Sequence, residues 1–188
     1  MKQELFFSID VEANGEIPGS FSMLSFGCAV FNAAGDLLDT FSANLETLPN
    51  AKASPDTMAW WSKNQAAYDA TRTNLQQPEQ AMQKFVDWVN SFDCKPVCVA
   101  YPAGFDFSWI YWYIIHFLGA GKSPFSFSCL DIKSFAMAVL KCNYRDATKK
   151  NMPKEWFPKS KHTHIAVEDS IEQGELFINI LKYNNKSP

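Results

Sequence analysis

The sequence lacks a long uninterrupted hydrophobic run. None of its apolar stretches approaches the roughly 20 residues that a helix needs to cross a bilayer. Residues Met1–Glu4 lead directly into a strand-like segment, without the apolar stretch and small-residue cleavage site of a signal peptide. We therefore expect a cytoplasmic protein that does not interact with a membrane.

The sequence also lacks the cysteine spacing of a zinc site. Its five cysteines form an odd set, and no Cys or His pair follows Cys94 and Cys98 at the interval that zinc ligands show. We expect buried free thiols instead. Repeats and low-complexity segments are missing too. The 188 residues, of which 47% are hydrophobic, suit one well-packed domain over residues 1–188.

A net positive charge, which is typical of proteins that bind nucleic acid without specificity, is missing from the chain as a whole. The formal net charge is −3. The distribution is uneven, however, because residues 141–164 include seven basic and two acidic side chains. This run is either a solvated surface loop or an electropositive arm beside an acidic site. Its basic residues are Lys141, Arg145, Lys149, Lys150, Lys154, Lys159 and Lys161.

The first segment with a clear periodicity is residues 4–11, where side chains alternate between two faces. Both faces carry bulky apolar residues, which predicts a central strand covered on both sides. The alternation places Asp10 and Glu12 on one face at the carboxyl end of this strand. Residues 23–31 and 37–45 are also strand-like and predict an antiparallel hairpin beside it.

The rest of the chain alternates between helical and strand patterns. We expect an α/β fold in which a mixed β-sheet, an antiparallel hairpin plus parallel strands, is flanked by helices on both faces. The expected helices are a short one from Ser54-Pro55, one from about Pro78, and 107–118, 132–140 capped by Asp131, and 166–183; the expected strands are 97–101 and 125–130. The connection 143–163 exceeds ordinary loop lengths, which favours a functional segment.

The last predicted helix has an unusual buried stripe. Asp169, Gln173, Leu176 and Ile180 fall on one face, so the stripe that meets the sheet begins with a carboxylate. A buried aspartate requires a cation, an arginine or several hydrogen-bond donors. His164 precedes Asp169 by five residues, in the loop that enters the helix.

Four acidic residues are predicted to lie near the end of a core strand or on the buried face of a helix. Each has an ordinary alternative: Asp106 as a helix cap, Asp169 as a first-turn acid, Asp10 and Glu12 as solvent-exposed strand-end residues. Together they lie at the carboxyl ends of core strands or on an inward stripe, where ligands bind in open α/β sheets. Carboxylates gathered on a core repel one another unless a cation binds between them, so the pattern predicts a divalent-metal site.

Three short motifs contain these acids, and a fourth contains Asp131. With these motifs the sequence resembles, over residues 5–181, the DEDDh 3′–5′ exonucleases, which have the ribonuclease H-like fold. Residues 55–61 further resemble the exoribonuclease-like branch. The motifs are Phe7-Ser-Ile-Asp10-Val-Glu12, Ala103-Gly-Phe-Asp106-Phe, Cys129-Leu-Asp131-Ile and His164-x-Ala166-x-x-Asp169.

The resemblance implies a function and a role for each residue. Asp10, Glu12, Asp106 and Asp169 would be ligands of two Mg²⁺ or Mn²⁺ ions, and His164 the general base. The substrate would be single-stranded nucleic acid or a 3′ overhang, RNA favoured over DNA, and the product a nucleoside 5′-monophosphate. The chain departs from the family where Ala13-Asn-Gly15 follows Glu12 and where Tyr101-Pro102 precedes the Phe-Asp pair. Neither departure removes a ligand or the base.

Aromatic and apolar residues near the motifs are candidates for binding the bases of the substrate, because bases stack on aromatic rings. They are Met23, Leu24, Trp60, Trp61 and Phe107, and burial in the core is the alternative for each tryptophan. A non-catalytic nucleic-acid-binding module on the same scaffold and a subunit whose main partner is another protein are competing hypotheses. Whether the chain forms a homodimer stays open.

Overall fold

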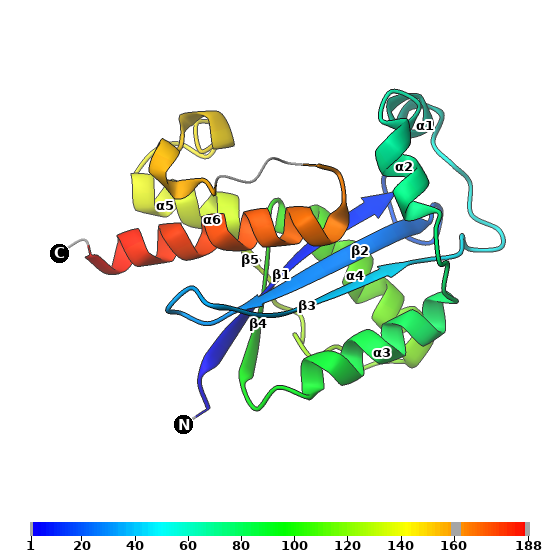
Figure 1. Cartoon of the computed structure of the whole chain (residues 1–188), viewed down its shortest axis with the longest axis horizontal. Helices are drawn as coiled ribbons and strands as arrows, with labels where there is room; N and C mark the ends of the chain where they lie inside the picture. Colours follow the sequence, from blue (N-terminus) through cyan, green and yellow to red (C-terminus); the bar gives the residue numbers. More distant parts are fainter. Residues whose placement is uncertain (1, 159–162, 187–188) are drawn as a thin grey trace.

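The computed structural model describes residues 2–158 and 163–186, arranged as a sheet with helices on both sides (Figure 1). Its elements are β1 (Glu4–Ala13), β2 (Met23–Phe31), β3 (Leu37–Asn44), α1 (Pro55–Trp61), α2 (Gln65–Thr71), α3 (Pro78–Asn90), β4 (Lys95–Ala100), α4 (Ala103–Leu118), β5 (Leu130–Asp131), α5 (Ile132–Leu140), the 3₁₀ turns η1 (Lys149–Asn151) and η2 (Lys154–Trp156), and α6 (Ala166–Lys186).

The five strands form one mixed sheet in the order β3-β2-β1-β4-β5. Strand β2 pairs antiparallel with β3, its partner in the hairpin, and with β1. In contrast, β4 pairs parallel with both β1 and β5. The predicted fold class, a ribonuclease H-like mixed sheet with antiparallel and parallel strands, is confirmed. Because β1 is the central strand, residues at its carboxyl end lie in the middle of one edge of the sheet.

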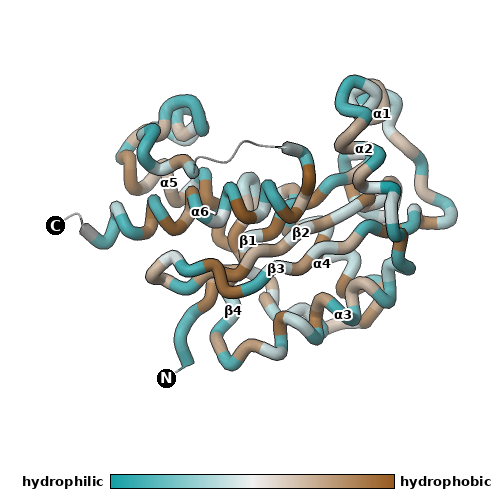
Figure 2. Tube along the Cα trace, in the orientation of Figure 1, coloured by the Kyte–Doolittle hydropathy of each residue, from teal (hydrophilic) through white to brown (hydrophobic). Residues whose placement is uncertain are grey.

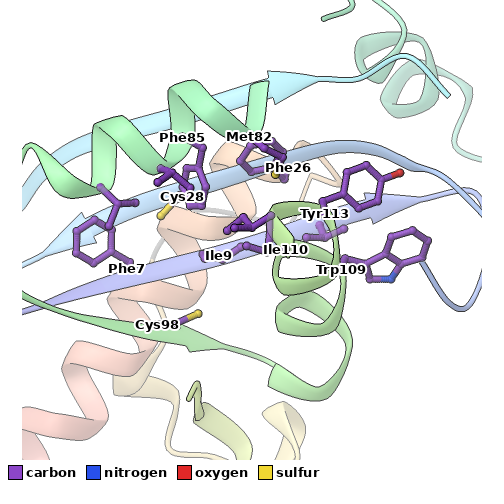
Figure 3. Packing of buried hydrophobic residues seen from close by; sticks show 14 of the residues in the cluster. Phe7, Ile9, Phe26, Cys28, Met82, Phe85, Cys98, Trp109, Ile110 and Tyr113 are labelled. Carbon is purple, nitrogen blue, oxygen red and sulfur yellow. The ribbon is translucent and has the colours of Figure 1, made fainter. Parts of the chain in front are cut away.

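The alternation along β1 supplies two separate cores. Leu5, Phe7 and Ile9 pack with α3 and α4 on one face of the sheet (Figure 3). Phe6 packs on the opposite face with α5 and α6, and its ring centroid lies 4.9 Å from that of Phe177. Apolar side chains on both faces stabilise the strand by removing their surface from water. Asp10 and Glu12 share their face of β1 with Phe6, so they lie on the α6 side.

The helices expose polar residues and bury an apolar stripe, which Figure 2 shows along α6 as alternating teal and brown. Leu176, Phe177 and Ile180 of α6 are buried against the sheet. Of the helices in the described part of the chain, none combines the length and apolar character needed to cross a bilayer.

Two glycines allow α6 to lie unusually close to the sheet. A Cβ atom added to Gly27 on β2 would lie 2.3 Å from the backbone nitrogen of Val167. A Cβ added to Gly174 would lie 2.3 Å from the ring of Phe31. Gly27 is the register partner of Asp10 on β1. The missing side chain therefore brings the first turn of α6 against the sheet beside Asp10.

Two of the predicted elements differ most from the structure in their boundaries. Helix α4 begins at Ala103 and not at residue 107, with Pro102 as its N-cap, so that only Tyr101 and Pro102 separate the helix from the end of β4 at Ala100. Asp106 is therefore a first-turn residue and not a cap. The predicted strand 125–130 is reduced to Leu130–Asp131. Ser126 adopts a φ of 55°, which interrupts the extended conformation, and the preceding Phe125 is buried in a turn.

Two further segments contain structure that the pattern did not predict. Helix α2 is only seven residues long and buries Thr71 alone, so it has no apolar stripe from which its periodicity could be predicted. In the long connection 141–158, Ala147, Met152 and Trp156 are buried. Lys159, Lys161 and His162 lie outside the described residues.

All five cysteines are free thiols, as predicted, but only three of them are buried. Cys28, Cys94 and Cys98 are free and buried, whereas Cys129 and Cys142 are free and half-buried. Burial raises the pKa of Cys28 and Cys98 well above the ordinary thiol value.

The close approach at Gly27 predicts a stability effect. Gly27→Ala places a methyl group against the backbone of α6 and lowers the free energy of unfolding by about 1–3 kcal/mol, the usual cost of overpacking. Gly104→Ala is the matched control, since nothing lies within 4 Å of its added Cβ. In urea denaturation the control retains or exceeds the wild-type stability, because alanine favours a helix. Equal stability of both variants would contradict the close packing of α6.

Candidate active site

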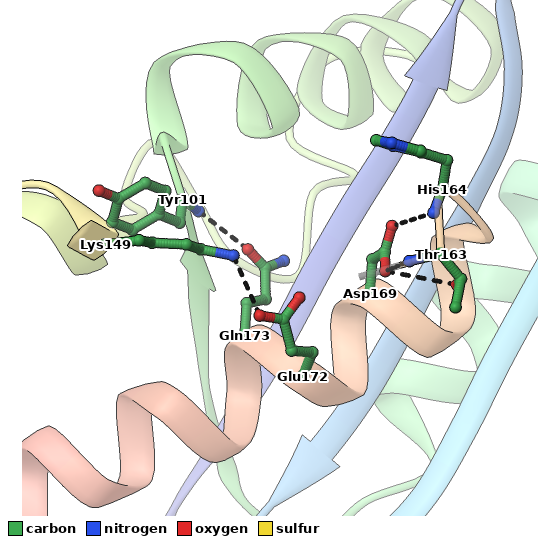
Figure 4. Close-up of polar contacts among 7 residues, drawn as sticks. All are labelled: Tyr101, Lys149, Thr163, His164, Asp169, Glu172 and Gln173. Atoms are coloured by element: carbon green, nitrogen blue, oxygen red, sulfur yellow. Dashed lines mark hydrogen bonds and ion pairs between the residues drawn. The ribbon is translucent and has the colours of Figure 1, made fainter. Parts of the chain in front are cut away.

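Asp169 and His164 lie together where α6 begins (Figure 4). Asp169 is only 1% exposed. Its two carboxylate oxygens accept hydrogen bonds from the backbone N–H groups of Thr163, at 2.9 Å, and His164, at 2.8 Å. His164 has a φ of 59°, in the left-handed region that non-glycine residues rarely adopt. The Asp169 carboxylate therefore holds the backbone of His164 in this left-handed conformation at the start of α6.

The cluster extends to β1. One ligand atom from each of Glu12, His164 and Asp169 lies within 4.8 Å of the others. Asp10 is two residues before Glu12 on the same face of the strand, beside Gly27 and the first turn of α6. The structure thus brings Glu12, His164 and Asp169 together and places Asp10 on the adjoining stretch of β1.

Asp106 reaches the same part of β1 from the other side of the site. Its Oδ1 atom accepts the backbone N–H of Val11, the residue between Asp10 and Glu12, at 3.0 Å. Asp106 is 3% exposed. Burial raises its pKa to about 8, the Val11 N–H group opposes that rise, and the nearby Glu12 charge adds to it. This carboxylate is costly to ionise in the protein alone, and a bound cation offsets that cost.

The chemistry of these side chains fits a hard divalent cation. Carboxylate oxygens are the ligands that Mg²⁺ and Mn²⁺ prefer, and Glu12 and Asp169 present them within one small volume. The buried Asp106 carboxylate, with its raised pKa, lacks sufficient compensation from the protein for a full negative charge. Both observations favour a cation among these acids.

Asp131 has the structural role predicted for it. Its Oδ1 atom accepts the backbone N–H of Ser134 at 2.6 Å and so caps α5. Its Oδ2 atom accepts the N–H of Ala103 at 2.9 Å. Asp131 therefore joins the starts of α5 and α4, and α4 is the helix that carries Asp106.

The candidate substrate residues separate into buried and accessible side chains. Met23, Leu24 and Trp61 are 0%, 1% and 1% exposed, so they belong to the core and have no free face for a base. The indole N–H of Trp61 donates to the carbonyl of Ala13 at 3.0 Å, which explains its burial. Phe107 is half-buried.

Trp60 is the accessible tryptophan, 39% exposed. Its ring packs edge-on against that of His164, with 4.8 Å between ring centroids. It also lines a cavity of about 360 Å³ together with Glu12, Thr57 and Phe105. Thr57 and Phe105 were not predicted as substrate contacts; the only signal was that Phe105 precedes Asp106 in its motif.

Within the described part of the basic segment, one lysine lies close to the acidic end of α6. Lys149 forms an ion pair with Glu172 at 3.3 Å and lies over the ring of Tyr101 (Figure 4). The described part of the segment is not fully solvated, because Met152 and Trp156 are buried, whereas Lys141, Lys150 and Lys154 are exposed. Binding of nucleic acid by this segment stays a prediction.

The fold and these side chains together define a class of protein. A mixed sheet with acids from β1, α4 and α6, and a histidine before the last helix, is the arrangement of the DEDDh 3′–5′ exonucleases with the ribonuclease H-like fold. Residues 6–181 match the family described as the 3′-5′ exoribonuclease Rv2179c-like domain. The chain belongs to this family.

Known proteins that resemble the chain agree with this assignment. The 3′-5′ DNA exonuclease Cap18 of Escherichia coli is 33% identical over 195 residues, which cover 98% of this chain and 95% of the relative. A crystal structure of a full-length 3′-exonuclease superposes with a TM-score of 0.73 at 16% identity, over 97% of this chain and 83% of the other. The nuclease domain of 3′hExo, a DEDDh family member bound to rAMP, gives a TM-score of 0.71 at 14% identity, over 95% and 91% of the two chains. At such identities the structural matches show the fold.

The electrostatics of Asp106 predict a stabilising effect of divalent ions. Millimolar Mn²⁺ raises the melting temperature of the wild type by about 5–10 °C, which corresponds to saturation at roughly 100 times the dissociation constant. Asp106→Asn retains the bond to Val11 and removes the buried charge. This variant is as stable as the wild type in EDTA but gains much less from Mn²⁺ in a thermal-shift assay. The same gain in both proteins would exclude Asp106 as a ligand.

Proposed function

We propose that this protein is a metal-dependent 3′–5′ exonuclease that releases nucleoside 5′-monophosphates from the 3′ ends of single strands or 3′ overhangs. The observation that carries the proposal is the group Glu12, His164 and Asp169, whose ligand atoms lie within 4.8 Å of one another. Asp106 lies beside it through its bond to Val11. The membership of the chain in a 3′–5′ exoribonuclease family supports the same reaction.

Asp10, Glu12, Asp106 and Asp169 are the proposed ligands of two Mg²⁺ or Mn²⁺ ions. Such ions would polarise the phosphodiester and stabilise the charge that develops on the departing oxygen. Support comes from the structurally similar S. pombe Pop2p, which has been solved with Mg²⁺ and Mn²⁺ bound, with a TM-score of 0.68 at 14% identity over 95% of this chain and 82% of Pop2p. The carboxylates come from three elements, so the substrate phosphate would lie in the angle between β1, α4 and α6.

His164 is the proposed general base. Its imidazole would accept a proton from the attacking water, because histidine exchanges protons most readily near neutral pH. Two features of the structure support this role. The backbone N–H of His164 is bound to Asp169, and its ring packs against Trp60. Both contacts hold the ring beside the acids instead of leaving it free in solvent.

The cavity lined by Trp60, Phe105 and Thr57 is the proposed site of the terminal base. A base stacked on an aromatic ring gains about 1–3 kcal/mol whatever its identity, which suits an enzyme that removes successive nucleotides. We propose a preference for RNA, which the exoribonuclease family description supports. The Escherichia coli relative is named a DNA exonuclease, which supports the opposite preference. Direct comparison of the two substrates decides between them.

The reaction is tested with single-stranded RNA labelled at either end, beside DNA of the same sequence. With Mn²⁺ present, 5′-labelled RNA yields a ladder of shorter products, 3′-labelled RNA releases a labelled mononucleotide at once, and DNA is degraded more slowly. Asp10→Asn abolishes the activity, because it removes a proposed ligand. His164→Ala lowers turnover by about 10²–10⁴-fold while calorimetry still detects Mn²⁺ binding.

Glu79→Gln is the control for these substitutions, since Glu79 is an exposed acid in the first turn of α3, and it keeps full activity. Salt-sensitive binding of RNA without shortening would contradict the proposal and favour the non-catalytic binding module. Faster degradation of DNA would overturn only the RNA preference.

Trp60 has two proposed contacts, one with the terminal base and one with His164. Trp60→Ala therefore raises KM and lowers kcat, with a combined loss in kcat/KM of about 5–150-fold if one base stack is removed. Trp60→Phe retains a ring at this position and recovers most of the activity. Steady-state kinetics on a short oligonucleotide measure both constants. If Trp60→Ala leaves both unchanged, the cavity beside Trp60 is not the base site.

A further inference from the structure

The amide of Gln173 joins two strands of the sheet beneath the acidic site. Gln173 is 3% exposed and lies on α6. Its Nε2 atom donates to the backbone carbonyl of Ile9 at 2.5 Å, and its Oε1 atom accepts the backbone N–H of Tyr101 at 3.1 Å. Figure 4 shows the side chain directed from the helix to Tyr101. Both ends of the amide are therefore used, each by a different strand segment.

These two bonds form where β1 and β4 separate. The parallel pairing of the strands ends at Ser8 and Val99. Ile9 and Tyr101 lie just beyond that point, and β4 itself ends at Ala100. A carboxamide carries a donor and an acceptor like a peptide group. Gln173 thus continues the link between the strands after their own pairing has ended.

On β1 the bond is made next to a proposed metal ligand. The Ile9 carbonyl belongs to the peptide group that also contains the nitrogen of Asp10. Gln173 itself is one helical turn after Asp169, on the same buried stripe. Its bond to β1 therefore fixes the distance between the strand that carries Asp10 and the helix that carries Asp169.

On the β4 side the bond is made at the entrance to α4. Tyr101 precedes Pro102, the N-cap of α4, and Asp106 lies in the first turn of that helix. The position of the Tyr101 backbone determines where α4 begins and hence where Asp106 lies. The Gln173 amide on α6 thus contacts the backbone that leads to Asp10 on β1 and the backbone that leads to Asp106 on α4.

We propose that Gln173 is a positioning residue that sets the spacing of Asp10, Asp106 and Asp169 for a divalent cation. Carboxylates that share a site repel one another, so the elements that carry them separate unless they are braced. Residues that orient metal ligands without touching the metal commonly change its affinity by about 10–100-fold when they are replaced. The inference rests on the proposed function for the identity of the metal ligands, and its experiment measures Mn²⁺ binding separately from nuclease activity.

A different role for Gln173 would be to satisfy two buried backbone groups. Loss of those bonds lowers stability, but it leaves the affinity for a cation unchanged. Stability alone therefore cannot separate the two roles, whereas Mn²⁺ affinity can. A matched bond occurs on the same helix, where the Nδ2 atom of Asn179 donates to the carbonyl of Trp156 at 2.9 Å. Trp156 belongs to η2 and not to an element that carries an acid.

The experiment compares Gln173→Met with Asn179→Leu, each close in shape to the residue it replaces and unable to form the hydrogen bonds. Isothermal titration calorimetry with MnCl₂ on the full-length protein measures the affinity. Gln173→Met weakens Mn²⁺ binding by about 10–100-fold, and Asn179→Leu leaves it at the wild-type value. In the oligonucleotide assay, Gln173→Met lowers kcat at limiting Mn²⁺ and recovers part of it at saturating Mn²⁺, while KM for the oligonucleotide is unchanged.

Gln173→Asn provides the same test if Gln173→Met does not fold, because it keeps the amide but shortens its reach by one methylene. Wild-type Mn²⁺ affinity in a folded Gln173 variant would overturn the proposal. An equal loss in Asn179→Leu would overturn it too, since the effect would then follow from loss of any bond on α6. If the wild type binds Mn²⁺ but degrades no oligonucleotide, the proposed function fails, and calorimetry still decides the role of Gln173.

Discussion

Carboxylates from three elements lie together at the carboxyl end of β1, and the rest of the structure depends on holding these like charges in place. The cost is visible at Asp106, where burial raises the pKa to about 8. The backbone opposes that cost with N–H groups: Val11 donates to Asp106, while Thr163 and His164 donate to Asp169. These bonds compensate part of the charge, and the proposed cation would compensate the remainder.

The sheet places these groups where they can act. The central strand β1 has antiparallel β2 on one side and parallel β4 on the other. Its pairing with β4 ends before the acids, so the strands separate and leave space at the edge of the sheet. Gly27 lets the first turn of α6 lie close to the sheet. The Gln173 amide binds Ile9 of β1 and Tyr101 after β4, where the two strands separate. The same few contacts thus pack α6 against the sheet and hold the acidic side chains close together.

Much of this arrangement could be predicted from the sequence because it depends on short-range periodicity. The alternation in residues 4–12 predicts a central strand with Asp10 and Glu12 on one face, and the helical stripe from Asp169 to Ile180 predicts that this carboxylate is buried. Both predictions agree with the structure. The predicted cap role of Asp131 does too.

What the sequence did not predict depends on tertiary contacts. Met23, Leu24 and Trp61 are apolar or aromatic, as residues that bind bases often are, but the neighbouring elements cover them completely. The segment 125–130 has the composition of a strand, yet the positive φ of Ser126 ends it early. The two bonds of Gln173 join residues far apart in the chain, so no local pattern indicates them. His164 was predicted as the base, whereas its contact with Trp60 became apparent only in three dimensions.

We propose that these carboxylates form a common site that is electrostatically favourable only with divalent ions bound. A crystal structure with Mn²⁺, and anomalous diffraction recorded at the manganese edge, tests it most directly. We expect two anomalous peaks about 4 Å apart, coordinated by oxygens of Asp10, Glu12, Asp106 and Asp169. An absence of peaks at this edge of the sheet at millimolar Mn²⁺, with the four carboxylates in the same positions, would contradict it.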